Sequence, residues 1–267
     1  MSPSTIVQKK FSFAASQYDI LTPFHREIGQ DLMKTYHQPL TEADTILDLG
    51  MGTGWMSHIL KKRYPLSLVI GLDFAAGMVA TAKKNHVGCP VVQADAHTLP
   101  FRQDVFDVII SNLTCQWIND WAGFLADMRG RLTARGSFCF SVFGYQTFQE
   151  IFGTLQHCVW RTGQTQKYPL LRLLDQKQLE QKFVNAGYPE VELKTFYYKI
   201  PFNDLVSILR WTKNIGANGL CYPLFIGKDH LHLANRVYRR RHRWMDRRVY
   251  TTFEIIVGQW QPAKSKG

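Results

Sequence analysis

The sequence has no hydrophobic run long enough to cross a membrane. None of its apolar stretches reaches the roughly 18 uninterrupted residues that a spanning helix needs. The first residues also lack the basic segment followed by an apolar segment that marks a secretory leader. We therefore expect a cytoplasmic protein with no membrane contact.

Paired cysteines and metal-ligand spacings are also missing. The chain has 5 cysteines in 267 residues, none of them in a C-x-x-C pair, which favours free thiols in a reducing compartment over a disulfide framework. The 9 histidines show no H-E-x-x-H or other paired ligand spacing. We expect no bound metal.

Acidic residues are scarce in the second half of the chain. Residues 1–149 contain 13 Lys and Arg against 12 Asp and Glu, whereas residues 150–267 contain 19 against 9. Almost all of the net charge of +11 therefore belongs to the second half, which carries +10. Such an uneven surface predicts an acidic partner: nucleic acid, an anionic membrane or an acidic protein. A solvated basic face without a partner is the alternative.

What the chain does have is an apolar segment that runs into a glycine-rich turn. Residues 46–54 read I-L-D-L-G-M-G-T-G, which predicts a buried strand and a tight turn whose bare backbone can approach a ligand. Residues 55–62 predict a helix with its N-terminus toward that ligand. This is the first βα unit of a doubly wound sheet. The dinucleotide fingerprint G-x-G-x-x-G would need a small residue at Trp55, which disfavours it; an unrelated glycine turn is the other alternative.

A second acid follows at the spacing that such a sheet requires. Residues 68–73 predict the second strand, and Asp73 comes roughly 20 residues after the last glycine, where this fold places an acid on ribose hydroxyls. A carboxylate suits that task because it can accept from both hydroxyls. Further strands are predicted at 91–95, 106–111, 138–143, 191–202 and 249–260.

Three motifs resemble those of the class I S-adenosylmethionine-dependent methyltransferases. They are D-x-G-x-G-x-G at 48–54, A-D-A-x-x-L-P-F at 94–101 and F-D-V-I-I-S-N at 106–112. The resemblance implies an α/β, Rossmann-like, doubly wound seven-stranded sheet, mostly parallel with an antiparallel edge strand, and S-adenosylmethionine as cofactor. One departure is Ala75, which replaces the serine of the family's frequent D-x-S.

The same resemblance implies roles for individual residues. Asp95 would accept from the adenine amino group, Phe74 and Met78 would flank the ring, and Tyr18, in an F-x-x-x-A-x-x-Y-D segment, would close over the cofactor; core packing is the alternative for Tyr18. The full set of expected cofactor-binding residues is Tyr18, Asp48, Gly50, Gly52, Gly54, Asp73, Phe74, Met78, Asp95, Ala96, Asn112 and Leu113.

Three shorter segments resemble the malonyl-acyl-carrier-protein O-methyltransferases of biotin synthesis. They are G-x-G-W-M-S at 52–57, S-N-L-x-x-Q-W at 111–117 and K-x-I-G-A at 213–217. The resemblance implies methylation of the free carboxylate of malonyl-acyl carrier protein, an early step toward pimeloyl groups. We expect Gln116 and Trp117 to orient the acceptor, and Lys213 or Arg210 to supply a cation; a surface charge is the alternative for both cations.

The expected organisation is a single methyltransferase domain over 1–267. Residues 1–40 would form an N-terminal helical cover, and residues 203–248 a helical cap between the last two strands. An acidic carrier protein would dock on a stripe of arginines that share one face if the segment is helical. These are Arg236, Arg239, Arg240, Arg243 and Arg247.

Three other functions remain open from the sequence. A small-molecule O- or C-methyltransferase, of quinone or carboxylate type, would share every cofactor motif but would not need a basic second half. A nucleic-acid methyltransferase would explain the charge, but the chain lacks an N/D-P-P-Y/F tetrad, so we expect no nucleic-acid substrate. A binding module without catalysis is disfavoured by the intact glycines and acids.

Overall fold

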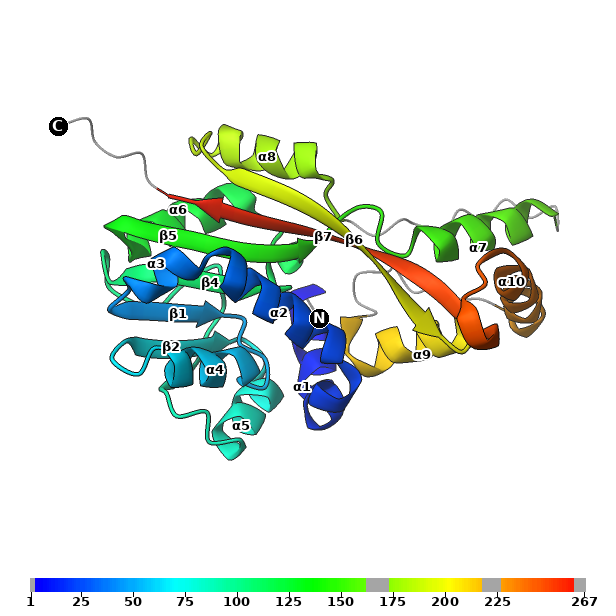
Figure 1. Cartoon of the computed structure of the whole chain (residues 1–267), viewed down its shortest axis with the longest axis horizontal. Helices are drawn as coiled ribbons and strands as arrows, with labels where there is room; N and C mark the ends of the chain where they lie inside the picture. The colour runs from blue at the N-terminus through cyan, green and yellow to red at the C-terminus, as the bar shows by residue number, and fades with distance from the viewer. Residues whose placement is uncertain (1–2, 162–172, 218–226, 262–267) are drawn as a thin grey trace.

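The structure, a computed structural model, describes residues 3–161, 173–217 and 227–261 (Figure 1). Its strands form one sheet in the order β3-β2-β1-β4-β5-β7-β6. Their bounds are Thr45–Leu49 (β1), Leu68–Asp73 (β2), Val91–Gln93 (β3), Phe106–Asn112 (β4), Leu132–Phe143 (β5), Glu192–Phe202 (β6) and Val249–Trp260 (β7).

The predicted fold class is confirmed. β1 to β5 pair in parallel, and β7 runs antiparallel to both of its neighbours. The antiparallel strand lies one position inside the expected edge, between β5 and the edge strand β6. The strand order reverses between β1 and β4, and ligands bind at such a switch point in open α/β sheets.

Helices cover both faces of the sheet (Figure 1). Their bounds are Pro3–Leu21 (α1), Pro23–Thr35 (α2), His37–Thr41 (α3), Trp55–Arg63 (α4), Ala76–Lys84 (α5), Trp121–Arg131 (α6), Gln149–Arg161 (α7), Gln176–Asn185 (α8), Leu205–Asn214 (α9) and Lys228–Arg241 (α10), with short 3-10 turns at Cys115–Trp117 (η1) and Met245–Arg247 (η3).

The apolar residues of the central strands alternate between two hydrophobic cores. On β1, Ile46 packs in the core that contains Leu32 of α2, whereas Leu47 packs in the core that contains Leu125 of α6 and Phe183 of α8. Successive side chains of a strand point to opposite faces, so a strand covered on both sides must be apolar throughout. The sheet is thereby fixed between two helical layers.

The basic run at 236–248 is not a single helix, contrary to the sequence prediction. α10 ends at Arg241. Arg243 instead forms an isolated antiparallel bridge with Val249, and Arg247 has a φ of +61° in η3. The chain must turn here to enter β7, so the helical condition of the prediction is not met at Arg243 and Arg247, which share no helix face with the other three arginines.

Three arginines of the run do lie on α10. Arg236, Arg239 and Arg240 are exposed, on the side of the helix opposite the buried Ala234 and Tyr238. The structure gives none of the three an ion pair with a described acid. Their charges are therefore available to a partner.

Close packing of α1 on α5 requires a glycine. A Cβ at Gly77 would lie 2.3 Å from the backbone oxygen of Ser12, so we expect Gly77→Ala to push α1 away from α5, to lower the melting temperature and to weaken cofactor binding. Gly130 on α6 has open space at its Cβ position, and Gly130→Ala should stabilise the protein by roughly 0.5–1 kcal/mol. Equal melting temperatures for the two variants would contradict this account of the α1 contact.

Candidate active site

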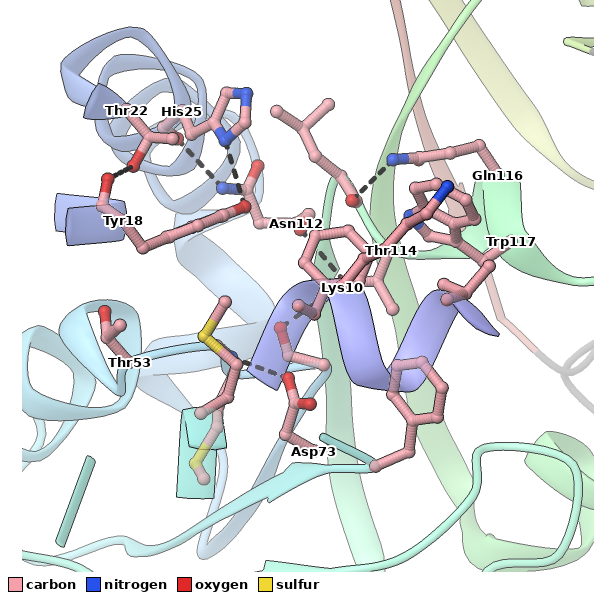
Figure 2. A pocket seen from close by; sticks show the side chains of 18 of the residues that line it. Lys10, Tyr18, Thr22, His25, Thr53, Asp73, Asn112, Thr114, Gln116 and Trp117 are labelled. Atoms are coloured by element: carbon pink, nitrogen blue, oxygen red, sulfur yellow. Dashed lines mark hydrogen bonds between the residues drawn. The ribbon is translucent and has the colours of Figure 1, made fainter. Parts of the chain in front are cut away.

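A cavity of about 940 Å³ lies at the carboxyl ends of β1, β2 and β4. Residues of α1, α2, α7 and α9 complete its wall, and Figure 2 shows several of them facing one another across it. This volume is at the upper end of the range for small-molecule sites. The cavity is large enough for a cofactor and part of a second substrate.

The glycine turn forms one side of this cavity, as predicted. Gly50 and Gly52 line it, and both have positive φ values, of 75° and 58°. A Cβ at Gly50 would collide with the Thr114 side chain at 2.2 Å. The turn therefore presents bare backbone that only glycine allows.

Gly54 lies outside the cavity wall. It precedes α4 with a φ of +85°. A Cβ at this position would lie 2.3 Å from Val87. Gly54 thus permits the turn and its packing against the segment after α5, and its contact with the cofactor stays a prediction.

Asp73 is buried at the end of β2 and faces the cavity. Its two carboxylate oxygens accept from the backbone N–H groups of Gly52, at 2.9 Å, and Ala75, at 2.8 Å. Burial raises the pKa of Asp73 to about 6, although these backbone hydrogen bonds oppose the shift. The carboxylate is therefore fixed in position and ionised above that pH.

Four other residues that we expect to bind the cofactor also line the cavity, namely Phe74, Met78, Asp95 and Ala96. Asp95 is half-exposed and accepts from both the backbone N–H and the ring of His97, at 3.0 and 2.8 Å. Burial tends to raise the pKa of Asp95, but these His97 contacts outweigh it and hold the pKa below its usual value.

Asp48 is fully buried beneath the glycine turn and borders the cavity. Its Oδ2 accepts from Ser57 Oγ at 2.5 Å, whereas its Oδ1 has no hydrogen-bond partner among the described residues. Burial, with a smaller contribution from Asp73, raises the pKa of Asp48 to about 7. The site holds a carboxylate that a cationic ligand group would satisfy.

This pKa predicts a pH-dependent stability for the cofactor-free protein. The folded pKa is above the unfolded value of about 3.9, so ionisation favours the unfolded state, and stability is lost as pH rises from about 4 to 7. We expect the free energy of unfolding of Asp48→Asn, compared with that of wild type, to increase by roughly 1–3 kcal/mol between pH 5 and pH 8. Denaturant unfolding of both proteins at the two pH values measures this difference. The same difference at both pH values would contradict the assignment.

Tyr18, Asn112 and Leu113 also line the cavity. The hydroxyl of Tyr18 lies 3.2 Å from Nδ1 of His25. The Asn112 amide is occupied by protein groups, because it donates to the His25 backbone oxygen and accepts from Ser141. Asn112 therefore anchors α2 to the end of β4 and offers little to a ligand.

Gln116 and Trp117 follow β4 in η1 and line the cavity, as expected. The Gln116 amide nitrogen donates to the Leu113 backbone oxygen at 2.6 Å, and its buried Oε1 has no partner among the described residues. Trp117 packs edge-to-face on Phe11 of α1, with ring centres 5.2 Å apart. Gln116 thus has an unpartnered acceptor atom at the cavity wall.

The two candidate cations of α9 differ in their position relative to the cavity. Lys213 lines the cavity although its side chain is exposed, which places it at the rim. Arg210 is exposed and absent from the cavity wall. Arg210 therefore lies outside the cavity wall, one helical turn before Lys213 and on the same side of α9, and its role as a cation of the site stays a prediction.

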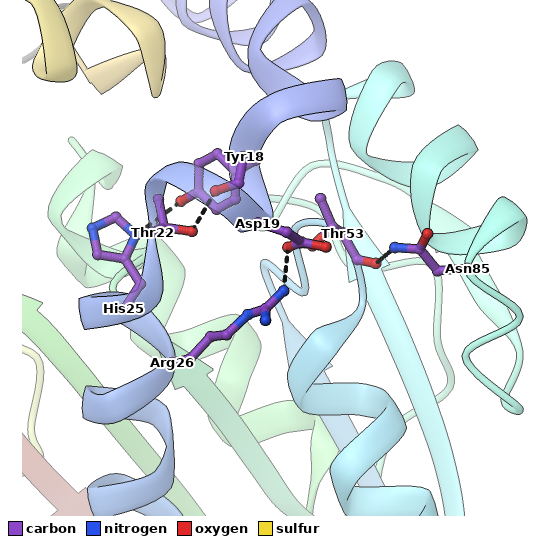
Figure 3. Close-up of polar contacts among 7 residues, drawn as sticks. All are labelled: Tyr18, Asp19, Thr22, His25, Arg26, Thr53 and Asn85. Atoms are coloured by element: carbon purple, nitrogen blue, oxygen red, sulfur yellow. Dashed lines mark hydrogen bonds and ion pairs between the residues drawn. The ribbon is translucent and has the colours of Figure 1, made fainter.

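Sequence reasoning missed His25 and Arg26 of α2, which both line the cavity. Arg26 pairs with Asp19 at 3.1 Å, and Thr53 of the glycine turn donates to the same carboxylate oxygen at 2.5 Å (Figure 3). These contacts join the start of α2 to the glycine turn. Nothing in their spacing marks them, because they come together only when α2 packs over the sheet.

The sequence also led us to expect no metal site and no membrane contact. Among the described residues, no three His, Cys, Asp or Glu side chains are gathered as a metal site. The described helices also include none that is long and apolar enough to cross a membrane.

Known proteins share this architecture and this sequence pattern. A methyltransferase domain family matches residues 47–140. A malonyl-[acyl-carrier protein] O-methyltransferase of Gallionella capsiferriformans is 28% identical over 96% of this chain and 90% of its own length. The similarity that three short segments predicted therefore extends over nearly the whole chain.

Solved structures agree on the fold. A putative methyltransferase from Bacillus halodurans superposes with a TM-score of 0.61 at 14% identity, over 88% of this chain and 100% of that one. Phosphoethanolamine N-methyltransferase 2 from Haemonchus contortus, solved with S-adenosyl-L-methionine, gives a TM-score of 0.53 at 15% identity, over 88% and 52%. The chain thus has the class I methyltransferase fold, and its methyltransferase domain and its relatives indicate an S-adenosylmethionine-dependent methyltransferase.

Proposed function

We propose that the protein transfers the methyl group of S-adenosylmethionine to the free carboxylate of a malonyl group on acyl carrier protein, an early step of biotin synthesis. Two observations support this. Relatives named as malonyl-[acyl-carrier protein] O-methyltransferases align with almost the entire chain. The predicted cofactor residues and an apolar wall from α7 also border the same cavity.

The cavity wall suits S-adenosylmethionine. We propose that Asp73 accepts from the ribose hydroxyls and Asp95 from the adenine amino group, while Tyr18 closes over the cofactor against Gly52. The unpartnered Oδ1 of Asp48 fits the ammonium of the methionine part, and Arg26, which lines the same cavity, fits the carboxylate. When bound, the cofactor supplies the electrophilic methyl group.

Methyl transfer to a carboxylate requires the protein mainly to position the acceptor. A carboxylic acid with a pKa of roughly 4 is ionised at neutral pH and needs no general base. The chain must hold one oxygen in line with the methyl group, at about 3 Å and away from water. Phe148, Ile151 and Phe152 give that half of the cavity an apolar wall.

The partner is an acidic carrier protein. We propose that residues 1–40 cover the cofactor, that the described part of 203–248 caps the acceptor half, and that carrier protein docks on Arg236, Arg239 and Arg240. α10, which carries these arginines, packs on α7 and α9, and both of those helices border the cavity. A carrier held there would present its flexible arm near the rim.

An acceptor panel tests the proposal. Methyl transfer is measured with malonyl-carrier protein, malonyl-coenzyme A, and small quinone or carboxylate acceptors at equal concentrations. We expect malonyl-carrier protein to give the highest kcat/KM. Preference for a free small molecule would overturn the proposal in favour of a small-molecule methyltransferase, and salt-sensitive methylation of nucleic acid would revive that alternative.

A further inference from the structure

His25 carries a buried polar atom that the protein leaves unused. The side chain lines the cavity from α2 and is only 8% exposed. Its Nε2 has no hydrogen-bond partner among the described residues. An unpaired buried polar group costs free energy, so a site that keeps one in a cavity wall usually satisfies it with a ligand.

The second ring nitrogen has a partner within the protein. Nδ1 lies 3.2 Å from the hydroxyl of Tyr18. Burial and the nearby carboxylates of Asp73 and Asp19 raise the pKa of Tyr18, so the phenol keeps its proton, which it can donate to Nδ1. In that tautomer the ring proton resides on Nε2 and makes that atom a donor, and the inference concerns this tautomer.

The ring is also held in place and kept neutral. Asn112 donates to the His25 backbone oxygen at 2.9 Å and ties this residue to the end of β4 (Figure 2). Phe143 of β5 and Trp211 of α9 lie against the imidazole, with ring centres 5.8 and 6.0 Å away. Burial lowers the pKa of His25 to about 4.

We propose that the Nε2–H of His25 donates a hydrogen bond to the carboxylate of the methyl acceptor and thereby selects acceptors that carry one. The inference rests on the proposed function and assigns its acceptor-binding residue. Two other donors of the wall already have one protein partner each: the Gln116 amide nitrogen donates to Leu113, and Nη2 of Arg26 pairs with Asp19. The Nε of Arg26 has no partner among the described residues, and we assign the rest of that guanidinium to the cofactor. Lys213 is exposed at the rim.

A neutral donor suits this reaction better than a cation. The negative carboxylate and the positive sulfonium lose their charges as the methyl group moves, so a strong ion pair would stabilise the ground state more than the transition state. A single N–H orients one carboxylate oxygen, which leaves the other free to face the methyl group. The aromatic rings around His25 exclude the water that would compete for that oxygen.

Two substitutions separate the donor from the shape of the site. His25→Leu removes the N–H, whereas His25→Gln places an amide N–H at a similar reach. We expect His25→Leu to lower kcat/KM for malonyl-carrier protein about 10-fold and His25→Gln to recover most of the loss. Both variants lose the contact between His25 Nδ1 and Tyr18, so their melting temperatures and their affinities for S-adenosylmethionine should match each other, whereas only His25→Gln restores a donor to the acceptor.

Binding measurements with carrier proteins distinguish a role of His25 in acceptor binding from a purely structural role. With S-adenosylhomocysteine present, wild type should bind malonyl-carrier protein more tightly than acetyl-carrier protein, whereas His25→Leu should bind both equally. A folded His25→Leu variant that keeps the preference, or a His25→Gln variant no better than it, would overturn the inference. A wild-type protein that binds S-adenosylmethionine but does not methylate malonyl-carrier protein would overturn the proposed function instead.

Discussion

Replacing Asp73 with alanine should weaken S-adenosylmethionine binding about 10- to 100-fold, the loss expected for hydrogen bonds to a buried charged group. The carboxylate lines the cavity and accepts from Gly52 and Ala75, so its loss would remove the proposed ribose acceptor and also loosen the glycine turn. Its pKa of about 6 also predicts that wild-type affinity falls as pH drops through 6, because protonation removes the acceptor. Titration calorimetry at pH 7.5 and pH 5.5 measures both effects.

Asp95 provides the matched comparison. It lines the same half of the cavity, but its side chain is 50% exposed, so water can replace much of what Asp95→Ala removes. We expect a loss of only a few-fold for that variant, within the range for a solvent-exposed hydrogen bond. A folded Asp73→Ala protein with unchanged affinity would remove Asp73 from the cofactor site.

Reversing the charges of Arg236, Arg239 and Arg240 to Glu should raise the KM for malonyl-carrier protein about 10- to 100-fold, because steering by complementary charge changes association rates on that scale. These residues are exposed on α10 and carry no ion pair with a described acid. The change should also reduce the salt dependence of KM. Methylation of malonyl-coenzyme A, where detectable, should stay nearly unchanged.

The control for that experiment reverses three exposed lysines at the other end of the molecule. Lys62 on α4 and Lys83 and Lys84 on α5 are exposed, and Figure 1 shows both helices far from α10. Changing these lysines to Glu gives the same net charge without touching α10. If both triple variants raise KM equally, the effect comes from overall charge, and α10 is not the docking face.

The parts of the fold that local sequence determines were predictable. The glycine turn needs positive φ at defined positions, and the apolar strands need burial on both faces, so the pattern of residues 46–54 indicates both at once. The starts of α8 and α9 also depend on local sequence, because Asp175 and Asp204 form the capping boxes of these helices.

What the sequence could not reveal depends on contacts between distant segments. α10 ends at Arg241 because the chain turns back to pair with β7, and no glycine or proline marks that point. Gly54 lies beside Val87, which belongs to the segment after α5 and comes close only in the folded chain. His25 and Arg26 join the cavity wall only because α2 packs on β4 and β5, and helical periodicity does not specify such packing.

The central claim is methyl transfer to a carrier-bound carboxylate, and the mass of the carrier protein tests it most directly. The protein is incubated with S-adenosylmethionine and either malonyl- or acetyl-carrier protein, and the intact carrier is weighed by mass spectrometry. We expect malonyl-carrier protein to gain one methylene mass as a methyl ester, and acetyl-carrier protein, which has no free carboxylate, to remain unchanged. No gain on the malonyl form, or an equal gain on both forms, would contradict the account.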